Sequence, residues 1–342
     1  NDGKVIVVSS DLYDSETETR GNVKLLVNNT DGDNWTQIAE IFNNQNSYGT
    51  YATISGDGSV IAMVNPGDGT NGKIITYKYI NNTLIKFNQE LPYESNWTSF
   101  LNRNISLNYD GSILAFNSYY EYEISTYKLN GQSWSKIDDV GYDPNINWDW
   151  SKNYVLQDLS EDGKKMLVKS RETFFDSLLF EEKEYFSSNI YELEEEKWVL
   201  SQSKINTFID TTSALVNIKN SDFAKFSQDM SSIIIAGSGV AARYKHDGDK
   251  YILDVSFLEV EDYNGGTRPN SGVTDFYNFD ISSEGDSIYF QKSSTPNENN
   301  VDLYILEPSD FDSDGIIDDL DNCIYNYNPI QGYAPSVSLN ET

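Results

Sequence analysis

The sequence is poor in the side chains that most often cross-link proteins or carry out catalysis. Its 342 residues include one cysteine, Cys323, and one histidine, His246. A single cysteine excludes an internal disulfide framework, and one cysteine with one histidine cannot form a zinc site of the usual four-ligand kind. Because His246 directly precedes Asp247-Gly248, we expect it at the tip of a hairpin and interpret it as a turn residue, not a general base.

Positive charge is scarce as well. The chain has 24 Lys and Arg residues against 54 Asp and Glu residues, which gives a formal net charge of −30 at pH 7. Such a surface repels phosphate backbones, so we expect no nucleic-acid partner. The longest apolar run, residues 233–242, has about half the length of a transmembrane helix and is broken by glycine, so we expect no membrane span in this stretch.

A short fragment recurs six times along the chain. Each copy is centred on an acidic residue, here termed the anchor, which is usually followed by glycine. The anchors are Asp2, Asp57, Asp110, Asp162, Asp229 and Glu284. They are about 55 residues apart, except that the step from Asp162 to Asp229 is longer by about a dozen residues. A near-constant period of this length is typical of a repeated supersecondary unit.

Apolar residues occupy fixed positions around each anchor. Where the sequence covers it, the third residue before the anchor is apolar, and so are the fourth and sixth residues after it. The pairs after the anchors are Ile6/Val8, Ile61/Met63, Leu114/Phe116, Met166/Val168, Ile233/Ile235 and Ile288/Phe290. Alternation by two places each pair on one face of a strand. The Asp-Gly between the strands favours a tight hairpin, so we interpret the anchor aspartates as turn residues.

Two further strand-like segments follow in most units, and the last of them often carries an aromatic residue. These aromatic residues are Trp35, Trp134, Trp198 and Tyr251. Four antiparallel strands in each complete unit predict an all-β fold: a β-propeller of about six four-stranded blades over residues 1–308. We interpret the periodic aromatic residues as packing between blades. The surplus residues around 174–186 are expected to protrude from the fourth blade.

The repeat resembles known propeller families. LNYDGSILAFNS (residues 107–118) and LSEDGKKMLVKS (residues 159–170) resemble the repeat of TolB-type propellers, and the fuller unit is similar to that of secreted propeller-repeat proteins. This resemblance implies the fold and no shared catalytic residues. The first unit lacks its first strand, and the sixth supplies three strands before Pro308. We therefore expect either further residues or a neighbouring molecule to complete the ring, because open strand edges invite pairing.

The twelve residues 310–321, DFDSDGIIDDLD, have the spacing of a calcium-binding loop. Gly315 stands at loop position 6, where the chain must turn sharply, and Ile316 at position 7 can offer its backbone carbonyl. The carboxylates at positions 1, 3, 5, 9 and 12 are Asp310, Asp312, Asp314, Asp318 and Asp321. Because Ca²⁺ prefers six to eight oxygen ligands, this register predicts one calcium ion.

The residues that follow the loop sharpen this interpretation. Asp321-Asn322-Cys323, then Asn328-Pro329 and Gln331, resemble a thrombospondin type 3 repeat. The resemblance implies an extracellular, calcium-stiffened segment over residues 309–342. It differs from such repeats in two respects, because the repeat is solitary and Cys323 has no partner cysteine in this chain.

No familiar catalytic motif stands out. There is no G-x-S-x-G elbow, and the box typical of propeller sialidases is missing, whereas a two-carboxylate glycosidase stays open because the separation of carboxylates is invisible in a sequence. We therefore predict that the chain is not an enzyme but an extracellular structural or adhesive module, a subunit of a larger surface or filamentous assembly. Its expected partners are other copies of itself or other surface proteins.

The alternative is a propeller that binds glycans or proteins, in the manner of a lectin or receptor domain. A glycoside-cleaving propeller is the third hypothesis. The chain also carries Asn-x-Ser/Thr sequons, each a candidate glycan attachment site in a secreted protein. They lie at Asn28, Asn34, Asn81, Asn96, Asn104 and Asn340.

Overall fold

The structure is a computed structural model of the whole chain, and every element it describes is a β-strand. The residues described are 4–14, 19–28, 34–42, 51–65, 72–93, 104–118, 123–141, 152–176, 181–203, 205, 223–237, 240–256, 276–283, 285, 287–293 and 299–305. Within these ranges the chain forms no helix of the length and apolar character needed to cross a membrane.

The strands form six antiparallel sheets in chain order, here called sheets 1 to 6. Sheet 1 consists of β1 (Val5–Asp14), β2 (Thr19–Asn28) and β3 (Trp35–Phe42). Sheet 2 consists of β4 (Tyr51–Ile54), β5 (Val60–Asn65), β6 (Gly72–Ile80), β7 (Thr83–Lys86) and β8 (Leu91–Tyr93). Sheet 3 consists of β9 (Ile105–Leu107), β10 (Ile113–Ser118), β11 (Glu123–Asn130) and β12 (Ser133–Val140).

The second half of the chain repeats the plan. Sheet 4 consists of β13 (Lys152–Leu159), β14 (Lys165–Asp176), β15 (Glu181–Glu194) and β16 (Lys197–Gln202). Sheet 5 consists of β17 (Phe223–Phe226), β18 (Ser232–Gly237), β19 (Val240–His246) and β20 (Tyr251–Ser256). Sheet 6 consists of β21 (Phe276–Ile281), β22 (Ser287–Ser293) and β23 (Asn299–Ile305).

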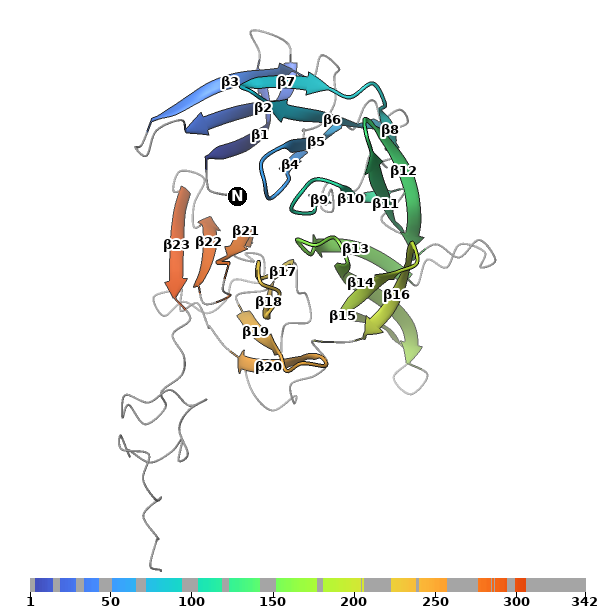
Figure 1. Cartoon of the computed structure of the whole chain (residues 1–342). Coiled ribbons are helices and arrows are strands. Elements are labelled where there is room, and N and C mark those ends of the chain that lie inside the picture. Colours follow the sequence, from blue (N-terminus) through green and yellow to red (C-terminus); the bar gives the residue numbers. More distant parts are fainter. Residues whose placement is uncertain are drawn as a thin grey trace, which may run out of the picture.

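The six sheets are arranged as blades around a common axis, with β4, β9, β13, β17 and β21 innermost (Figure 1). This confirms the predicted all-β propeller of about six blades. Sheets 1 and 6 each show three strands within the described residues, whereas sheets 3, 4 and 5 have four. The predicted C-terminal segment, residues 309–342, lies outside the described residues, so its boundary with the propeller stays a prediction.

The anchor turns form one recurring hydrogen-bond network. In sheet 2 the Ser55 hydroxyl donates to Asp57 Oδ1 at 2.6 Å and accepts from the Val60 amide at 2.9 Å. The Ser59 amide donates to the same Asp57 oxygen at 2.8 Å. The turns anchored by Asp110, Asp162 and Asp229 repeat these bonds. The four anchor aspartates that the structure describes are therefore turn residues, as predicted from the Asp-Gly pattern.

The electrostatics of the turn agree with this role. Partial burial acts to raise the pKa of Asp110, but the hydrogen bonds from Ser112 and Asn108 outweigh it and leave that pKa below its ordinary value. The pKa of Asp229 is lowered in the same way, because hydrogen bonds from Ser231 and Ser227 outweigh the effect of burial. Hydrogen bonds to the charged form favour that form, so these carboxylates stabilise their turns as anions.

Within the described residues, the residue after the anchor has a left-handed backbone, and at three of these positions it lies close against the preceding sheet. Gly111 has a φ of +67°, and a Cβ placed there would lie 2.5 Å from the Val60 side chain of sheet 2. Gly163 and Gly285 approach Ile113 and Ser232 in the same manner. In sheet 5 this position is Met230, which adopts a φ of 58° although it is not glycine. The fold thus demands a left-handed residue here and favours one without a side chain.

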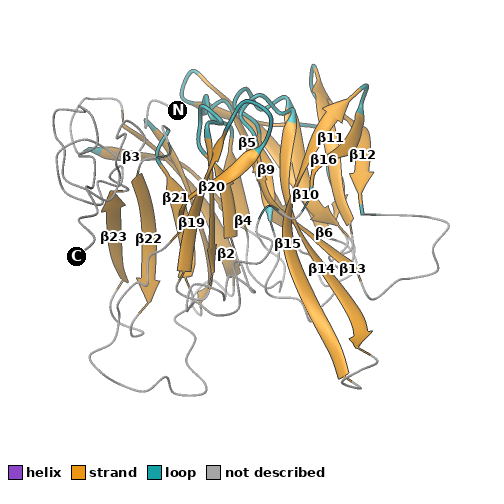
Figure 2. Cartoon of the chain, turned by 90° about the horizontal axis from the view of Figure 1, so that it is seen from below, coloured by secondary structure: helices purple, strands orange, loops and turns teal. Residues whose placement is uncertain are grey.

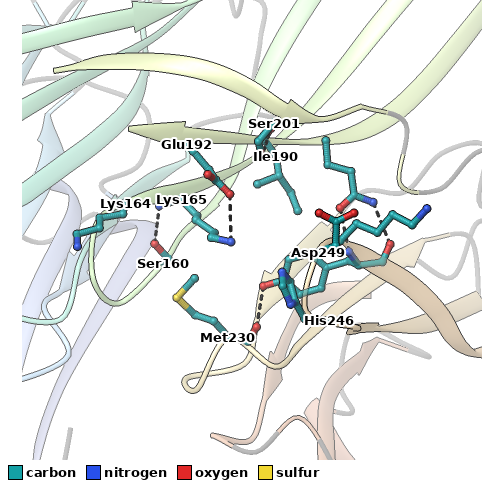
Figure 3. Close-up of polar contacts among 12 residues, drawn as sticks. Ser160, Lys164, Lys165, Ile190, Glu192, Ser201, Met230, His246 and Asp249 are labelled. Atoms are coloured by element: carbon teal, nitrogen blue, oxygen red, sulfur yellow. Dashed lines mark hydrogen bonds and ion pairs between the residues drawn. The ribbon is translucent and has the colours of Figure 1, made fainter. Parts of the chain in front are cut away.

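Three of the four periodic aromatic residues pack between sheets, as predicted, whereas Trp35 is 39% exposed and does not. The Trp134 indole N–H donates across to the Thr76 hydroxyl of sheet 2 at 3.0 Å, and Trp198 bonds to Thr126 of sheet 3 at 2.9 Å. Figure 3 shows polar contacts where sheets 4 and 5 meet. In sheet 5 a tyrosine, Tyr251, takes the place of the tryptophan, and it belongs to the same buried cluster as Leu167 and Ile190 of sheet 4. The Tyr251 hydroxyl donates within its own sheet, to the Met230 carbonyl at 2.7 Å.

The hydrophobic core is divided between neighbouring sheets. One cluster joins sheets 2 and 3, a second joins sheets 3 and 4, and a third joins sheets 4 and 5. The surplus residues of the fourth unit lengthen the β14–β15 hairpin, whose strands stay paired as far as Asp176 and Glu181. Figure 2 shows this hairpin projecting from the ring, which confirms the predicted protrusion.

Candidate functional site

A cavity of about 330 Å³ lies where the inner strands of five sheets converge. Sheets 2 to 6 all contribute to it, through their inner strands and the anchor turns that follow, so it opens at the end of the propeller where these turns cluster (Figure 2). We call it the turn-side cavity. Its lining residues are Thr53, Ile54, Gly56, Ser106, Leu107, Tyr109, Asp158, Leu159, Glu161, Lys225, Phe226, Ser227, Gln228, Ile281 and Ser283.

Most of these residues occupy three positions of the repeat. The third residue before each anchor is the apolar one predicted from the sequence, and it forms the base of the lining. The fourth residue before the anchor is Thr53, Ser106, Asp158 or Lys225. The residue directly before the anchor is Gly56, Tyr109, Glu161, Gln228 or Ser283. Among the lining residues these last two positions vary from sheet to sheet, and together they give the cavity two carboxylates, one ammonium group, hydroxyls, an amide and a phenol.

Asp158 also holds two sheets together. Its Oδ2 accepts a hydrogen bond from the backbone amide of Phe226 at 3.0 Å, which ties the inner strand of sheet 4 to that of sheet 5. Glu161 carries its carboxylate on the anchor turn of the same sheet, and its backbone carbonyl accepts from the Tyr109 amide at 2.8 Å. The two carboxylates therefore stand on elements that neighbouring sheets fix in place.

Backbone hydrogen bonds between successive turns make the rim of the cavity rigid. The Asp57 amide donates to the Tyr109 carbonyl at 2.8 Å, and the Asp229 amide donates to the Ser283 carbonyl at 3.2 Å. The Tyr109 side chain is 41% exposed and lies over Gly56, where an added Cβ would be 2.4 Å from the ring. Glycine at position 56 thus allows the phenol ring to lie across the cavity rim.

The predicted calcium ligands cannot be placed by this structure. Asp310, Asp312, Asp314, Ile316, Asp318 and Asp321 all lie outside the described residues, as does Cys323. Across the ranges that are described, no group of three or more His, Cys, Asp or Glu side chains is arranged to hold a metal ion. The calcium site therefore stays a prediction from the sequence.

His246 has the structural role expected of it. Its Nδ1 accepts a hydrogen bond from the Gly248 amide at 3.1 Å, and its ring packs edge-on against Tyr251 at a centroid distance of 4.8 Å. The sequon residue Asn104 is also engaged, because its amide nitrogen donates to the Leu156 carbonyl of sheet 4. A glycan on Asn104 would break this contact between sheets.

Sequence reasoning did not single out the lining of the turn-side cavity. Asp158, Glu161 and Lys225 belong to no motif, and the sequence is rich in acids, so single carboxylates carry little information. A sequence signal for these lining positions was nevertheless present in the repeat. Packing positions such as Leu107 and Leu159 keep the same apolar character in every unit, whereas the two lining positions change from unit to unit. Divergence among otherwise similar repeats marks residues that the fold leaves free.

Comparisons with known proteins support the fold. No protein-family model matches the sequence, and no curated protein does. Among solved structures, the periplasmic gluconolactonase of Pseudomonas aeruginosa is similar with a TM-score of 0.51 and 13% identity, covering 90% of this chain and 84% of that one. A Bacteroides fragilis protein named as a 6-phosphogluconolactonase is similar with a TM-score of 0.51 and 9% identity, covering 89% of this chain and 78% of that one. These likenesses show a β-propeller.

TolB of Acinetobacter baumannii is a further similar structure. Its TM-score is 0.45 at 14% identity, and the alignment covers 89% of this chain and 61% of that one. A likeness at this level does not distinguish one propeller family from another.

The comparisons correct the prediction that the chain is not an enzyme. Two propellers that share its fold bear lactonase names, so the absence of familiar nucleophile motifs does not exclude catalysis on this scaffold. The physical reason is that carboxylate chemistry needs no contiguous motif. Asp158, Glu161 and Lys225 come from different strands and turns and meet only in the folded ring.

Proposed function

We propose that the chain is an extracytoplasmic propeller that binds a small, neutral, polyhydroxylated ligand of the sugar or sugar-lactone class in its turn-side cavity. The observation that carries this proposal is the convergence of polar side chains from five sheets on one cavity. Its volume of about 330 Å³ lies at the small end of the usual range for ligand pockets. A monosaccharide-sized ligand suits that space better than a polymer.

The chemistry of the lining favours hydroxyl groups. Carboxylates such as Glu161 accept hydrogen bonds from two adjacent hydroxyls, and the Lys225 ammonium group donates to them. The exposed ring of Tyr109 offers an apolar surface for the C–H face of a sugar. Two carboxylates against one ammonium group, on a chain of net charge −30, disfavour a phosphorylated ligand. We therefore favour a neutral ligand over a phosphate ester.

Ligand binding is testable by titration calorimetry with neutral monosaccharides, their δ-lactones and the matching 6-phosphates. We expect a neutral compound to bind, and Glu161→Gln and Lys225→Met each to weaken it at least about tenfold, through the loss of a charged hydrogen bond. Glu195→Gln and Lys197→Met, at exposed sites on sheet 4, are the matched controls and should bind as the parent chain does. Tighter binding of the phosphates, or equal losses in the controls, would contradict the proposal.

Lactone hydrolysis is the second candidate function. The specific observation in its favour is that two carboxylates and an ammonium group line the same cavity. In such a reaction a carboxylate takes a proton from water as the oxygen attacks the lactone carbonyl, and Lys225 stabilises the negative oxygen that forms. The C–O bond of the ring then breaks, and the released alkoxide takes up a proton to give the hydroxy acid.

Acid release from glucono-δ-lactone, followed in a pH-stat above the spontaneous rate, checks this second candidate. We expect Glu161→Gln to lower the enzymatic rate by about 10²-fold or more, since general-base catalysis contributes about 10²–10⁴-fold. Asp158→Asn is less informative, because Asp158 also joins sheets 4 and 5. A rate equal to the spontaneous one in the parent chain excludes hydrolysis and leaves the binding proposal intact.

We propose in addition that residues 309–342 form a calcium-stiffened segment of a protein exposed outside the cytoplasm, where other copies or other surface proteins are its partners. The support is the register of Asp310, Asp312, Asp314, Asp318 and Asp321, with the carbonyl of Ile316 as a further ligand. The strong acidity of the chain fits such a role, because bound cations would reduce repulsion between neighbouring acidic surfaces.

Calorimetry with CaCl₂ on the full chain checks the calcium segment. We expect one ion per chain with a Kd of about 0.1–1 mM, the range of extracellular calcium modules. The double substitution of Asp312 and Asp314 to Asn should abolish this heat, since it removes two carboxylates at the heart of the loop. The double substitution of Glu194 and Glu195 to Gln, which removes the same charge elsewhere, should leave it unchanged. Heat that survives the first pair would place the ion elsewhere.

A further inference from the structure

The inner strand of sheet 4 contains a β-bulge directly before a lining residue of the turn-side cavity. In β13, Leu156 pairs with Val168 of β14. The next pair is Asp158 with Leu167, which leaves Gln157 as an extra residue. The inner strands β4, β9 and β17 pair with the strands beside them without such a shift. Because bulges re-aim side chains and recur beside functional sites, this one is a candidate positioning device.

The bulge decides which way Asp158 faces. Because side chains alternate along a strand, a regular β13 would place Asp158 on the same face as Leu156. That face belongs to the buried cluster between sheets 3 and 4, which contains Leu156 and Leu159. With the bulge, Asp158 stands opposite Leu167, which belongs to the cluster between sheets 4 and 5. From there its carboxylate accepts from the Phe226 amide at 3.0 Å and lines the cavity.

Two asparagines of sheet 3 hold the backbone of β13 next to the bulge. Asn117 is 3% exposed, and its side-chain amide makes two bonds to β13. Its Oδ1 accepts from the Leu156 amide at 2.9 Å, and its Nδ2 donates to the Tyr154 carbonyl at 2.8 Å. Asn104 Nδ2 donates to the Leu156 carbonyl. Both backbone groups of Leu156, the residue before the bulge, are therefore bonded to side chains of sheet 3.

A chain of contacts thus runs from sheet 3 to the charged lining of the cavity. Asn117 bonds to Leu156, and the bulge links Leu156 to Asp158. Asp158 in turn bonds to the Phe226 amide of β17. Lys225, which directly precedes Phe226, supplies the ammonium group of the lining. The positions of two charged lining groups therefore depend on how β13 is held.

We propose that Asn117, together with Asn104, is a positioning residue for the turn-side cavity. The two side chains fix the bulge of β13, the bulge directs Asp158 into the cavity, and Asp158 holds the strand that carries Lys225. Neither asparagine is a lining residue, so both act on a ligand through β13. The part of the proposal that concerns a ligand rests on the proposed function, whereas the positioning of Asp158 does not.

Site-resolved hydrogen exchange of the Phe226 amide tests the positioning of Asp158 without a ligand. The rate is expressed relative to the amides of the neighbouring strand β18, so that a global loss of stability cancels. We expect Asn117→Ala to raise this relative rate at least about tenfold, because the bond from the Phe226 amide to a carboxylate is weakened.

Gln89→Ala is the matched control. Gln89 Nε2 donates to the Trp134 carbonyl at 3.0 Å, and its Oε1 accepts from the Trp134 amide at 2.6 Å. Like Asn117, it therefore makes two side-chain bonds to the backbone of the next sheet, but on the outer strands. Gln89→Ala should leave the relative exchange rate of the Phe226 amide unchanged.

Calorimetric titration with D-glucose and with glucono-δ-lactone tests the consequence for binding. We expect Asn117→Ala to weaken binding at least about tenfold and Gln89→Ala to bind as the parent chain does. Asn104→Ala removes one bond to β13 in place of two, so its effect should have the same direction and be smaller. Circular dichroism checks that each variant folds, and if Asn117→Ala does not, Asn104→Ala decides both assays.

The outcomes separate this proposal from the proposed function. An unchanged relative exchange rate of the Phe226 amide overturns the proposal, as does an equal rise in Gln89→Ala. Binding that neither asparagine variant weakens overturns it as well. If the parent chain binds neither probe while Asn117→Ala still raises the exchange rate, the positioning of Asp158 is supported and the proposed function is contradicted.

Discussion

The close approach of anchor turns to the preceding sheet, seen at three of the described turns, is the constraint on which the rest of this structure depends. Gly111 lies so near Val60 that no side chain fits between them, and Gly163 lies near Ile113 in the same way. This contact fixes the distance between neighbouring sheets at their inner ends. The buried apolar pairs and the aromatic residues of the outer strands then fill the wedge-shaped space that opens toward the outside of the ring.

The same constraint explains where functional variation is possible. The turn glycine, its anchor aspartate and the apolar residue three positions earlier are all needed for packing or for the turn. The residue directly before the anchor and the one four positions before it line the turn-side cavity instead. These positions hold Glu161 and Asp158 in sheet 4, and Tyr109 and Ser106 in sheet 3. A ring of nearly identical blades can in this way carry an asymmetric site.

Much of the architecture could be predicted from the sequence because the determinants are local. The Asp-Gly turns, the alternation of Leu114 and Phe116, and the spacing of Trp134 and Trp198 are each readable within a few residues. The protruding hairpin followed from a count of surplus residues. Such features need no knowledge of which sheets meet in space.

The turn-side cavity and the exposure of Ile6 and Val8 in sheet 1 could not be read in this way. Glu161 and Lys225 are separated by 64 positions in the sequence and meet only because the ring brings sheets 4 and 5 together. Ile6 and Val8 follow the apolar pattern perfectly, so the sequence predicts a strand but not whether anything covers it. The prediction that the chain is not an enzyme failed because it relied on contiguous sequence motifs. In a propeller, side chains from separate blades such as Glu161 and Lys225 come together only in the folded ring.

The most direct test of this account compares two glycines with the same backbone conformation. Gly111 and Gly131 both have a φ of +67°, but an added Cβ meets Val60 at 2.5 Å in the first case and nothing within 4 Å in the second. Alanine at either site carries the cost of a left-handed backbone, about 1–2 kcal/mol. Gly111→Ala should lower the free energy of unfolding by about a further 1–3 kcal/mol, because it forces the two sheets apart. Equal losses in urea denaturation for the two variants would contradict the claim that contact between sheets at the anchor turns organises the ring.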